Sequence, residues 1–408
     1  MKKTVLRNYA RLIARAGGNV QKGQDVIIRA SLDQPEFVRM LTEECYACGA
    51  RMVRVEWSDL GVTKLTQKKA TLKVLSTMED WEVAKLKHES ETLPVTIWLE
   101  SDDPDGLKGV NQAKMSKAAQ AKYKIRKPYR DAMENKYQWC IAAVPGAAWA
   151  KKVFPGLSKN QAIEKLWEAI LYTSRADGDP MAAWEAHNKD LEARCAYLNS
   201  LGIETLEYRA ANGTDLRVGM IEDALFMGGA EATQGSGTVF NPNIPSEEVF
   251  ISPKKGVADG IVYSSKPLSY RSELIDNFRM RFEGGKVVEA HADVGDALLQ
   301  EMISMDEGAA YLGECALVPY DSPICNSGIL FYNTLFDENA ACHLALGHGF
   351  TNVIRDYDRY TMQECYDKGI NDSMIHVDFM IGTADLSITA VTRDGRRVPI
   401  FENGNWAF

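Results

Sequence analysis

Histidine and carboxylate residues in the last part of the chain have the types and spacing of metal ligands. Of six histidines, three (His343, His348 and His376) fall within residues 328–385. Imidazole and carboxylate groups suit zinc, cobalt or manganese. His376 and Asp378 are two residues apart in the apolar run Met-Ile-His-Val-Asp-Phe-Met-Ile. Such a run predicts a strand, and a spacing of two places both side chains on one face.

Two glutamates stand out by their surroundings. Glu248 opens an apolar run after a proline turn (Asn-Ile-Pro-Ser-Glu-Glu-Val-Phe), which suits the rim of a site. Glu314 is flanked by apolar residues (Tyr-Leu-Gly-Glu-Cys-Ala-Leu-Val). A carboxylate buried there is costly unless it is paired or bound to a metal ion. A salt bridge or a helix cap is the alternative interpretation for either residue.

The composition is that of a globular protein with more than one domain. At 408 residues the chain exceeds one ordinary core, so two or three domains are expected. A hydrophobic content of 45% and a charged content of 25% are typical of soluble proteins. The net charge of −9 argues against nucleic acid or an anionic membrane as the main partner.

The cysteines indicate a reducing compartment. Eight are scattered, mostly within apolar runs, as reduced and buried thiols are. Cys45 and Cys48 form one Cys-X-X-Cys, but no second pair completes a zinc site, so packing is favoured over a redox role. The N-terminus has no long apolar segment, and no run reaches the roughly 18 apolar residues of a membrane span. We therefore predict a cytoplasmic protein.

Strands and helices alternate in the first half of the chain. Helices are predicted at about 4–17, 34–48, 66–91, 111–135 and 158–174, and strands at 25–30, 51–57, 94–100 and 138–145. This alternation predicts an α/β domain over 1–195, with a parallel sheet covered by helices. No Gly-X-Gly-X-X-Gly or Walker A motif is present, so a nucleotide site is not supported. The domain is expected to act as a scaffold or to gate the substrate.

Short strands separated by turn residues dominate after residue 200. The turns include Asn212-Gly213 and Glu-Gly-Gly-Lys at 283–286, which suits a hairpin. Helices are expected at 297–305 and 338–345. These features predict an α+β domain over 196–408 that is rich in antiparallel strands and carries the candidate metal ligands.

Four motifs in this half resemble those of the metallo-aminopeptidase family that includes aminopeptidase T and aminopeptidase S. The motifs are Asn-Ile-Pro-Ser-Glu-Glu-Val-Phe (243–250), Leu-Gly-Glu-Cys-Ala-Leu-Val (312–318), Asn-Thr-Leu-Phe-Asp-Glu-Asn-Ala-Ala-Cys-His-Leu-Ala-Leu-Gly (333–347) and Ile-His-Val-Asp-Phe-Met-Ile-Gly (375–382). They occur in the family's order and at its separations. The resemblance extends over essentially the whole chain and is strongest over 200–408.

The resemblance implies an enzyme and a set of site residues. The family's metal ligands fall on Glu248, Glu314, His343, His376 and Asp378. They would form a centre of two divalent ions (zinc, cobalt, manganese or magnesium) that share a carboxylate and a water molecule. Glu314 is also the candidate to carry the proton. The implied activity is hydrolytic release of N-terminal amino acids from peptides with a free N-terminus, by a homodimer whose N-terminal domain helps to enclose the site.

One position departs from the family pattern. The family often has a tyrosine seven residues after its first ligand histidine, where this chain has Phe350. Phenylalanine has no side-chain donor. Either another group serves, with Tyr332, Tyr357 and His348 as candidates, or the activity is altered. Two alternatives therefore stay open: a two-metal hydrolase of another amide or a phosphate ester, and a non-catalytic homologue that binds metal or peptide.

Overall fold

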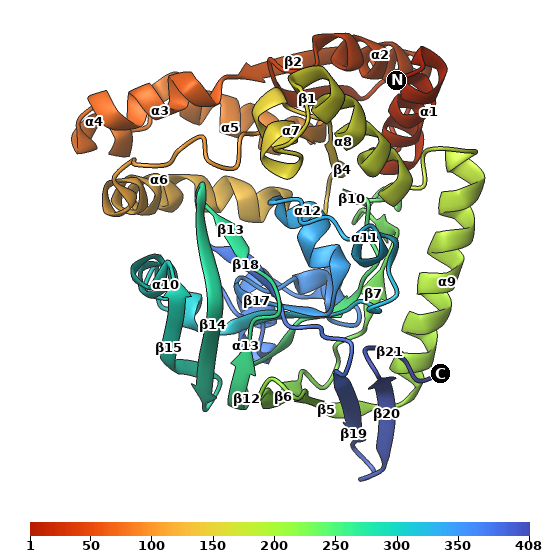
Figure 1. Cartoon of the computed structure of the whole chain (residues 1–408), viewed down its shortest axis with the longest axis vertical. Helices are drawn as coiled ribbons and strands as arrows, with labels where there is room; N and C mark the ends of the chain where they lie inside the picture. Colours follow the sequence, from red (N-terminus) through yellow and green to blue (C-terminus); the bar gives the residue numbers. More distant parts are fainter. The chain divides into compact units, whose positions relative to one another are not determined.

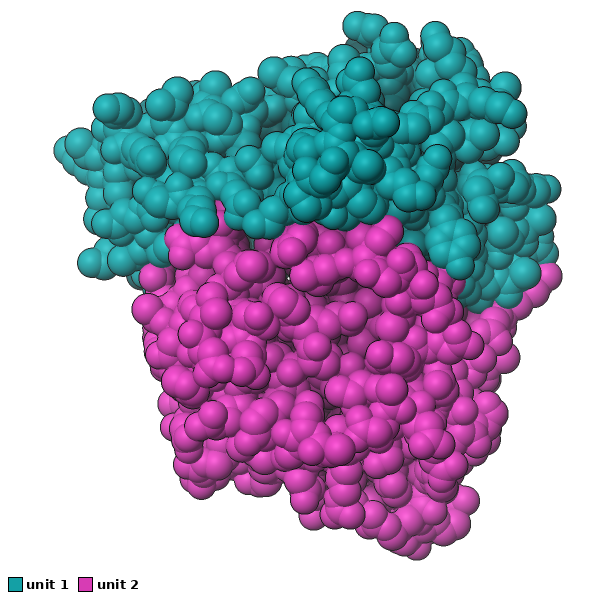
Figure 2. Space-filling view, viewed as in Figure 1, with its two compact units in different colours: residues 1–188, 229–246 teal, residues 189–228, 247–408 magenta.

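The computed structural model describes residues 1–408, which form two compact units. The first contains residues 1–188 and 229–246, and the second contains residues 189–228 and 247–408 (Figure 2). The chain enters the second unit within helix α9 (Pro180–Ser200) and later returns to the first for residues 229–246.

The first unit is built on a parallel sheet, as the sequence predicts. Its strand order is β10-β4-β3-β1-β2, and every neighbouring pair is parallel. Figure 1 labels β1, β2, β4 and β10 of this sheet. The interior strand β1 is apolar and mostly buried, as expected for a strand covered on both faces. The strands are β1 (Asp25–Ser31), β2 (Met52–Ser58), β3 (Val95–Glu100), β4 (Trp139–Ala143) and β10 (Asn243–Ile244); β8 (Glu231–Ala232) and β9 (Val239–Phe240) pair separately.

Helices connect these strands. They are α1 (Lys3–Leu12, continued by a π-helical turn over Ile13–Gly17), α2 (Pro35–Ala47), α3 (Leu60–Lys69), α4 (Leu72–Ser76), α5 (Asp80–Thr92), α6 (Gln112–Met133), α7 (Ala147–Val153) and α8 (Lys159–Thr173). The helical stretch predicted at about 66–91 is divided, since parts of three helices occupy this region. Thr71 and Glu79 each cap a new helix start, and side-chain caps favour an end over continuation.

The second unit contains a large, mostly antiparallel sheet, as predicted. Its order is β13-β14-β12-β6-β5-β19-β20-β21, with β15 paired to β14. The strands are β5 (Ile203–Arg209), β6 (Asp215–Met220), β12 (Pro253–Tyr263), β13 (Leu268–Tyr270), β14 (Glu273–Glu283), β15 (Lys286–Val294), β19 (Ser387–Thr392), β20 (Arg397–Glu402) and β21 (Asn405–Trp406). The β14–β15 hairpin turns at Gly284 and Gly285, which both have positive φ.

A smaller antiparallel sheet in the same unit carries the candidate ligands. Its order is β18-β17-β16-β11-β7, with β7 (Met227–Gly228), β11 (Val249–Ile251), β16 (Leu312–Leu317), β17 (His343–Gly347) and β18 (His376–Met380). The helix predicted at 338–345 is wrong. A 3₁₀ turn (Glu338–Ala340) comes first, and His343 then opens strand β17. Residues 343–347 are buried on both faces, so burial in the sheet overrides the helix preference of alanine and leucine.

Short helices complete the second unit. They are α10 (Asp296–Ile303), α11 (Pro323–Asn326), α12 (Thr334–Asp337) and α13 (Met362–Lys368), with 3₁₀ turns at Gly308–Ala310, Thr351–Val353 and Tyr357–Arg359. None of the chain's helices combines the length and the apolar character needed to cross a membrane.

Candidate metal centre

Strands β16, β17 and β18 of the small sheet, and the residue before β11, carry the five candidate ligands. Glu314 on β16 and Asp378 on β18 both lie opposite Ala345 of β17. Directly opposed residues point to the same face of a sheet, as do residues two apart. His343 is therefore on this face with Ala345, and His376 with Asp378. The small side chain of Ala345 leaves space between the two carboxylates.

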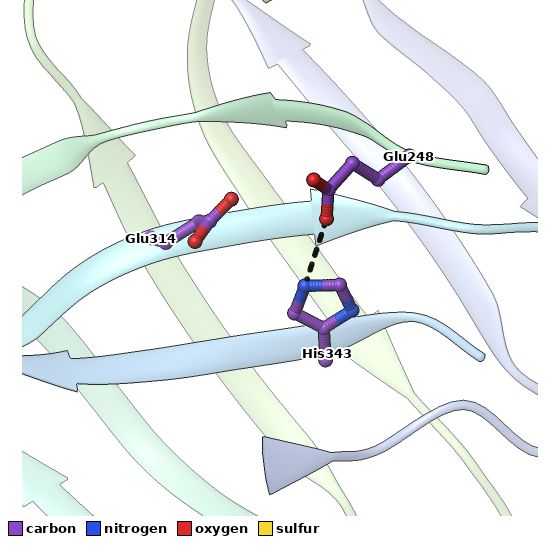
Figure 3. A group of neighbouring side chains, drawn as sticks. All are labelled: Glu248, Glu314 and His343. Atoms are coloured by element: carbon purple, nitrogen blue, oxygen red, sulfur yellow. Dashed lines mark ion pairs between the residues drawn. The ribbon is translucent and has the colours of Figure 1, made fainter. Parts of the chain in front are cut away.

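Glu248, Glu314 and His343 form the first group of candidate ligands. Their side chains approach a common space from β16, from β17 and from the residue that precedes β11 (Figure 3). One potential ligand atom from each lies within 4.8 Å of the others. His343 Nε2 is 3.1 Å from Glu248 Oε2, and the histidine is completely buried.

Glu314, His376 and Asp378 form the second group, also with ligand atoms within 4.8 Å of one another. His376 Nε2 is 3.0 Å from Glu314 Oε2 and 3.2 Å from Asp378 Oδ1. Glu314 thus belongs to both groups. The imidazole of His376 is partly exposed, with a side-chain exposure of 25%, whereas that of His343 has none.

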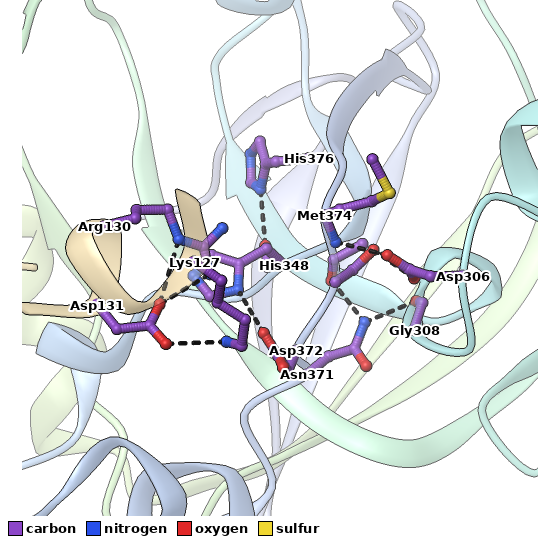
Figure 4. A network of polar contacts seen from close by, with 12 residues as sticks. Lys127, Arg130, Asp131, Asp306, Gly308, His348, Asn371, Asp372, Met374 and His376 are labelled. Carbon is purple, nitrogen blue, oxygen red and sulfur yellow. Dashed lines mark hydrogen bonds and ion pairs between the residues drawn. The ribbon is translucent and has the colours of Figure 1, made fainter. Parts of the chain in front are cut away.

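Backbone carbonyls fix the tautomer of both histidines. His376 Nδ1 donates to the carbonyl oxygen of His348 over 2.7 Å (Figure 4), and His343 Nδ1 donates to that of Ala341 over 3.2 Å. A carbonyl oxygen can only accept, so each Nδ1 carries the proton. In the neutral ring Nε2 then has the free lone pair, as metal-bound histidines require.

The electrostatics of the cluster favour positive charge within it. Burial alone would lower the pKa of His343, but the Glu248 carboxylate raises it to about 9. Burial would likewise lower the pKa of His376, yet Asp378 and Glu314 raise it well above its usual value. Burial raises the pKa of Glu314 to about 7, against the lowering effect of His376. The carboxylates therefore create a strong local preference for bound cations.

Glu338 is a further carboxylate of this site that the sequence interpretation missed. It lies on the 3₁₀ turn before β17, is buried, and accepts a hydrogen bond from Asn339 Nδ2 over 3.3 Å. Burial, and then Asp378 and Glu248, raise its pKa well above the usual value. A hydrogen bond from Glu338 also helps to lower the pKa of Asp378. The signal used for Glu314, an acid flanked by apolar residues, does not mark Glu338, because its neighbours Asp337 and Asn339 are polar.

Phe350 lies against the second group. Its ring centre is 4.9 Å from that of His376 and 5.4 Å from that of Phe250. The backbone N–H of Phe350 donates to Ser252 Oγ over 2.8 Å, which fixes this part of the chain. The position beside His376 is thus filled by an apolar ring that offers no hydrogen-bond donor.

The residues present fit divalent metal ions. His343 Nε2 and Asp378 Oδ1 are buried atoms whose near neighbours are other candidate ligand atoms, at 3.1 Å (Glu248 Oε2) and 3.2 Å (His376 Nε2), as expected of atoms gathered around an ion. Two imidazoles and three carboxylates suit zinc, cobalt or manganese. This donor set makes the chain a candidate metal-dependent enzyme, with Glu314 common to both groups of possible ligands.

Comparison with known proteins gives the family. The model of the thermophilic metalloproteases (M29) matches residues 2–406, so the chain belongs to this family of metalloproteases. It is 41% identical over 405 residues to aminopeptidase AmpS of Bacillus subtilis, covering 99% of this chain and 98% of that protein. It is 37% identical over 406 residues to aminopeptidase T of Thermus aquaticus, covering 98% of each. The structure of wild-type AmpT from Thermus thermophilus matches with a TM-score of 0.89 and 36% identity over 100% of both chains.

These findings confirm the family resemblance seen in the sequence and the class of enzyme. They concern the whole chain, because each alignment covers nearly all of this chain and of the compared protein. The roles of the individual site residues, and the number and identity of the ions, stay predictions.

Proposed function

We propose that the protein is an aminopeptidase that uses two divalent metal ions to release N-terminal amino acids from peptides. The observation that carries the proposal is the sharing of Glu314 by two adjacent groups of ligands. Glu248 and His343 would hold one ion with Glu314, and His376 and Asp378 would hold the other. Ions held by these residues would polarise a substrate carbonyl group and lower the pKa of a bound water molecule from 15.7 to roughly 7.

The chain's own residues supply binding and proton transfer. Both oxygens of Glu314 are needed if it joins the two groups, which leaves Glu338 as a second candidate to carry the proton. A buried glutamate with a raised pKa can accept a proton from water and donate it to the leaving amine. The free α-amine of the substrate would bind beside these acids, which restricts cleavage to chain ends. A homodimer stays a prediction from the resemblance.

The test is release of free leucine from a leucyl peptide and from its N-acetylated twin. The protein is stripped with a chelator and reloaded with cobalt or zinc. We expect release from the unblocked peptide only, and only with metal. Equal release from both peptides would contradict an aminopeptidase, and release by the stripped protein would contradict a metal requirement.

Phe350 favours a second candidate, a two-metal hydrolase of another amide or of a phosphate ester. If metal binds and neither leucyl peptide is cut, a panel of such substrates separates this candidate from a protein that binds without turnover.

Replacing Phe350 with tyrosine tests the role of this position. The ring already lies 4.9 Å from that of His376, so a phenol there could donate to an oxyanion formed at the centre. We expect kcat on a leucyl anilide to rise on the order of tenfold, below the 10²–10³ of a fully aligned donor, with KM nearly unchanged. Phe350→Leu is the control, since it removes the ring without adding a donor. An unchanged kcat in Phe350→Tyr would mean that another group serves.

A further inference from the structure

Gly313 interrupts the regular alternation of strand β16 immediately before Glu314. Leu312 pairs with Leu346, but Glu314 pairs with Ala345, so Gly313 is an extra residue in a β-bulge. In a regular strand Leu312 and Glu314 would share a face. The bulge instead lets Leu312 pack in the hydrophobic core, where it is 3% exposed, while Glu314 faces the ligands on the other side.

Gly313 also leaves space for a backbone carbonyl. A Cβ atom at this position would lie 2.3 Å from His348 O, 2.5 Å from Gly347 O and 2.6 Å from His348 C. These are backbone atoms, so they cannot rotate away as a flexible side chain would. The backbone of Gly313 is not in the left-handed region. The requirement for glycine here is therefore one of space rather than of conformation.

The carbonyl that approaches Gly313 is the one that orients His376. His348 O accepts the hydrogen bond from His376 Nδ1 over 2.7 Å (Figure 4). His348 N in turn donates to Ile375 O over 2.7 Å, which ties the two segments together. A displacement of this carbonyl would turn the imidazole of His376 away from Glu314 and Asp378.

We propose that Gly313 is a positioning residue for the second ligand group, because the space it leaves admits the His348 carbonyl that orients His376. The inference rests on the proposed metal centre. It predicts a selective effect, because His343 of the first group is oriented by Ala341 and not by this carbonyl.

The experiment is cobalt binding by the full chain carrying Gly313→Ala. We expect the variant to retain one tightly bound ion, while the dissociation constant of the second rises about 10- to 100-fold, as for loss of a ligand's hydrogen-bonding partner. The visible spectrum of the second cobalt ion should also change, because His376 would be displaced from that ion. Gly219→Ala is the matched control: its Cβ would lie 2.5 Å from Val257 Cγ1 on strands without ligands. It should bind two ions as the wild type does.

A second measurement does not depend on the variant. Nitrogen-15 spectra of histidine in the wild-type protein should show His376 protonated at Nδ1. Three results would overturn the inference: an Nε2-protonated His376, normal binding of both ions by Gly313→Ala, or failure of this variant to fold, which would indicate a general packing role. If the wild type itself binds no second ion, the proposed two-metal function fails instead.

Discussion

Replacing His376 with alanine is expected to remove one of two metal ions and to lower kcat/KM by more than about a thousandfold, because the pKa of the attacking water is lowered only while it is metal-bound. The first group keeps all its members (Glu248, Glu314 and His343), so one ion should remain. Asp378→Ala should act in the same way. Metal content after dialysis and turnover of a leucyl peptide, measured on the same samples, check both effects.

His291→Ala is the matched control. This histidine also lies near carboxylates, 3.7 Å from Asp293 and 3.5 Å from Asp296, but its side chain is half exposed and it is in neither ligand group. The variant should keep both ions and full activity. Circular dichroism of all variants verifies the fold. Two ions or undiminished turnover in His376→Ala would refute the assignment of the second group.

The part of the site that follows strand periodicity could be predicted from the sequence. His376 and Asp378 are two apart in an apolar run, and this spacing fixes a common face once the run is a strand. The structure places both on β18, with His376 Nε2 3.2 Å from Asp378 Oδ1. The parallel sheet of the first unit was predictable for a related reason, since short apolar runs alternated with helical stretches.

The region around His343 could not be predicted in this way. Strand β17 is buried on both faces, so its sequence shows no alternation of apolar and polar residues. Its one alanine and two leucines favour a helix locally, and only pairing with β16 and β18 makes it a strand. Glu338 was missed as a consequence, because its position depends on the 3₁₀ turn that precedes this strand.

Two other features depend on pairings between distant segments. The bulge at Gly313 exists only in the register between β16 and β17, and the sequence Leu-Gly-Glu does not specify it. Residues 243–244 likewise join the first unit by pairing with β4, about a hundred residues earlier in the chain. No local pattern of residue types reports such a pairing.

Glu338→Gln should separate proton transfer from metal binding. Glutamine keeps the size of the side chain but cannot carry the proton, so kcat should fall by about 10²- to 10⁴-fold. Both ions should remain, because the two ligand groups do not include Glu338. The measurements are metal content and the pH dependence of kcat. If Glu338 is the proton carrier, the pH dependence that it causes in the wild type should disappear in the variant.

Glu247→Gln is the control for Glu338→Gln, since Glu247 is also a buried glutamate of this unit and is in neither ligand group. It should leave kcat within a few-fold of the wild type. Loss of an ion from Glu338→Gln would make this residue a ligand and return proton transfer to Glu314. Full activity with both ions would exclude Glu338 from the reaction.

Glu314→Gln should have a different effect from these variants. It changes a residue that belongs to both ligand groups, so it should weaken the binding of both ions at once.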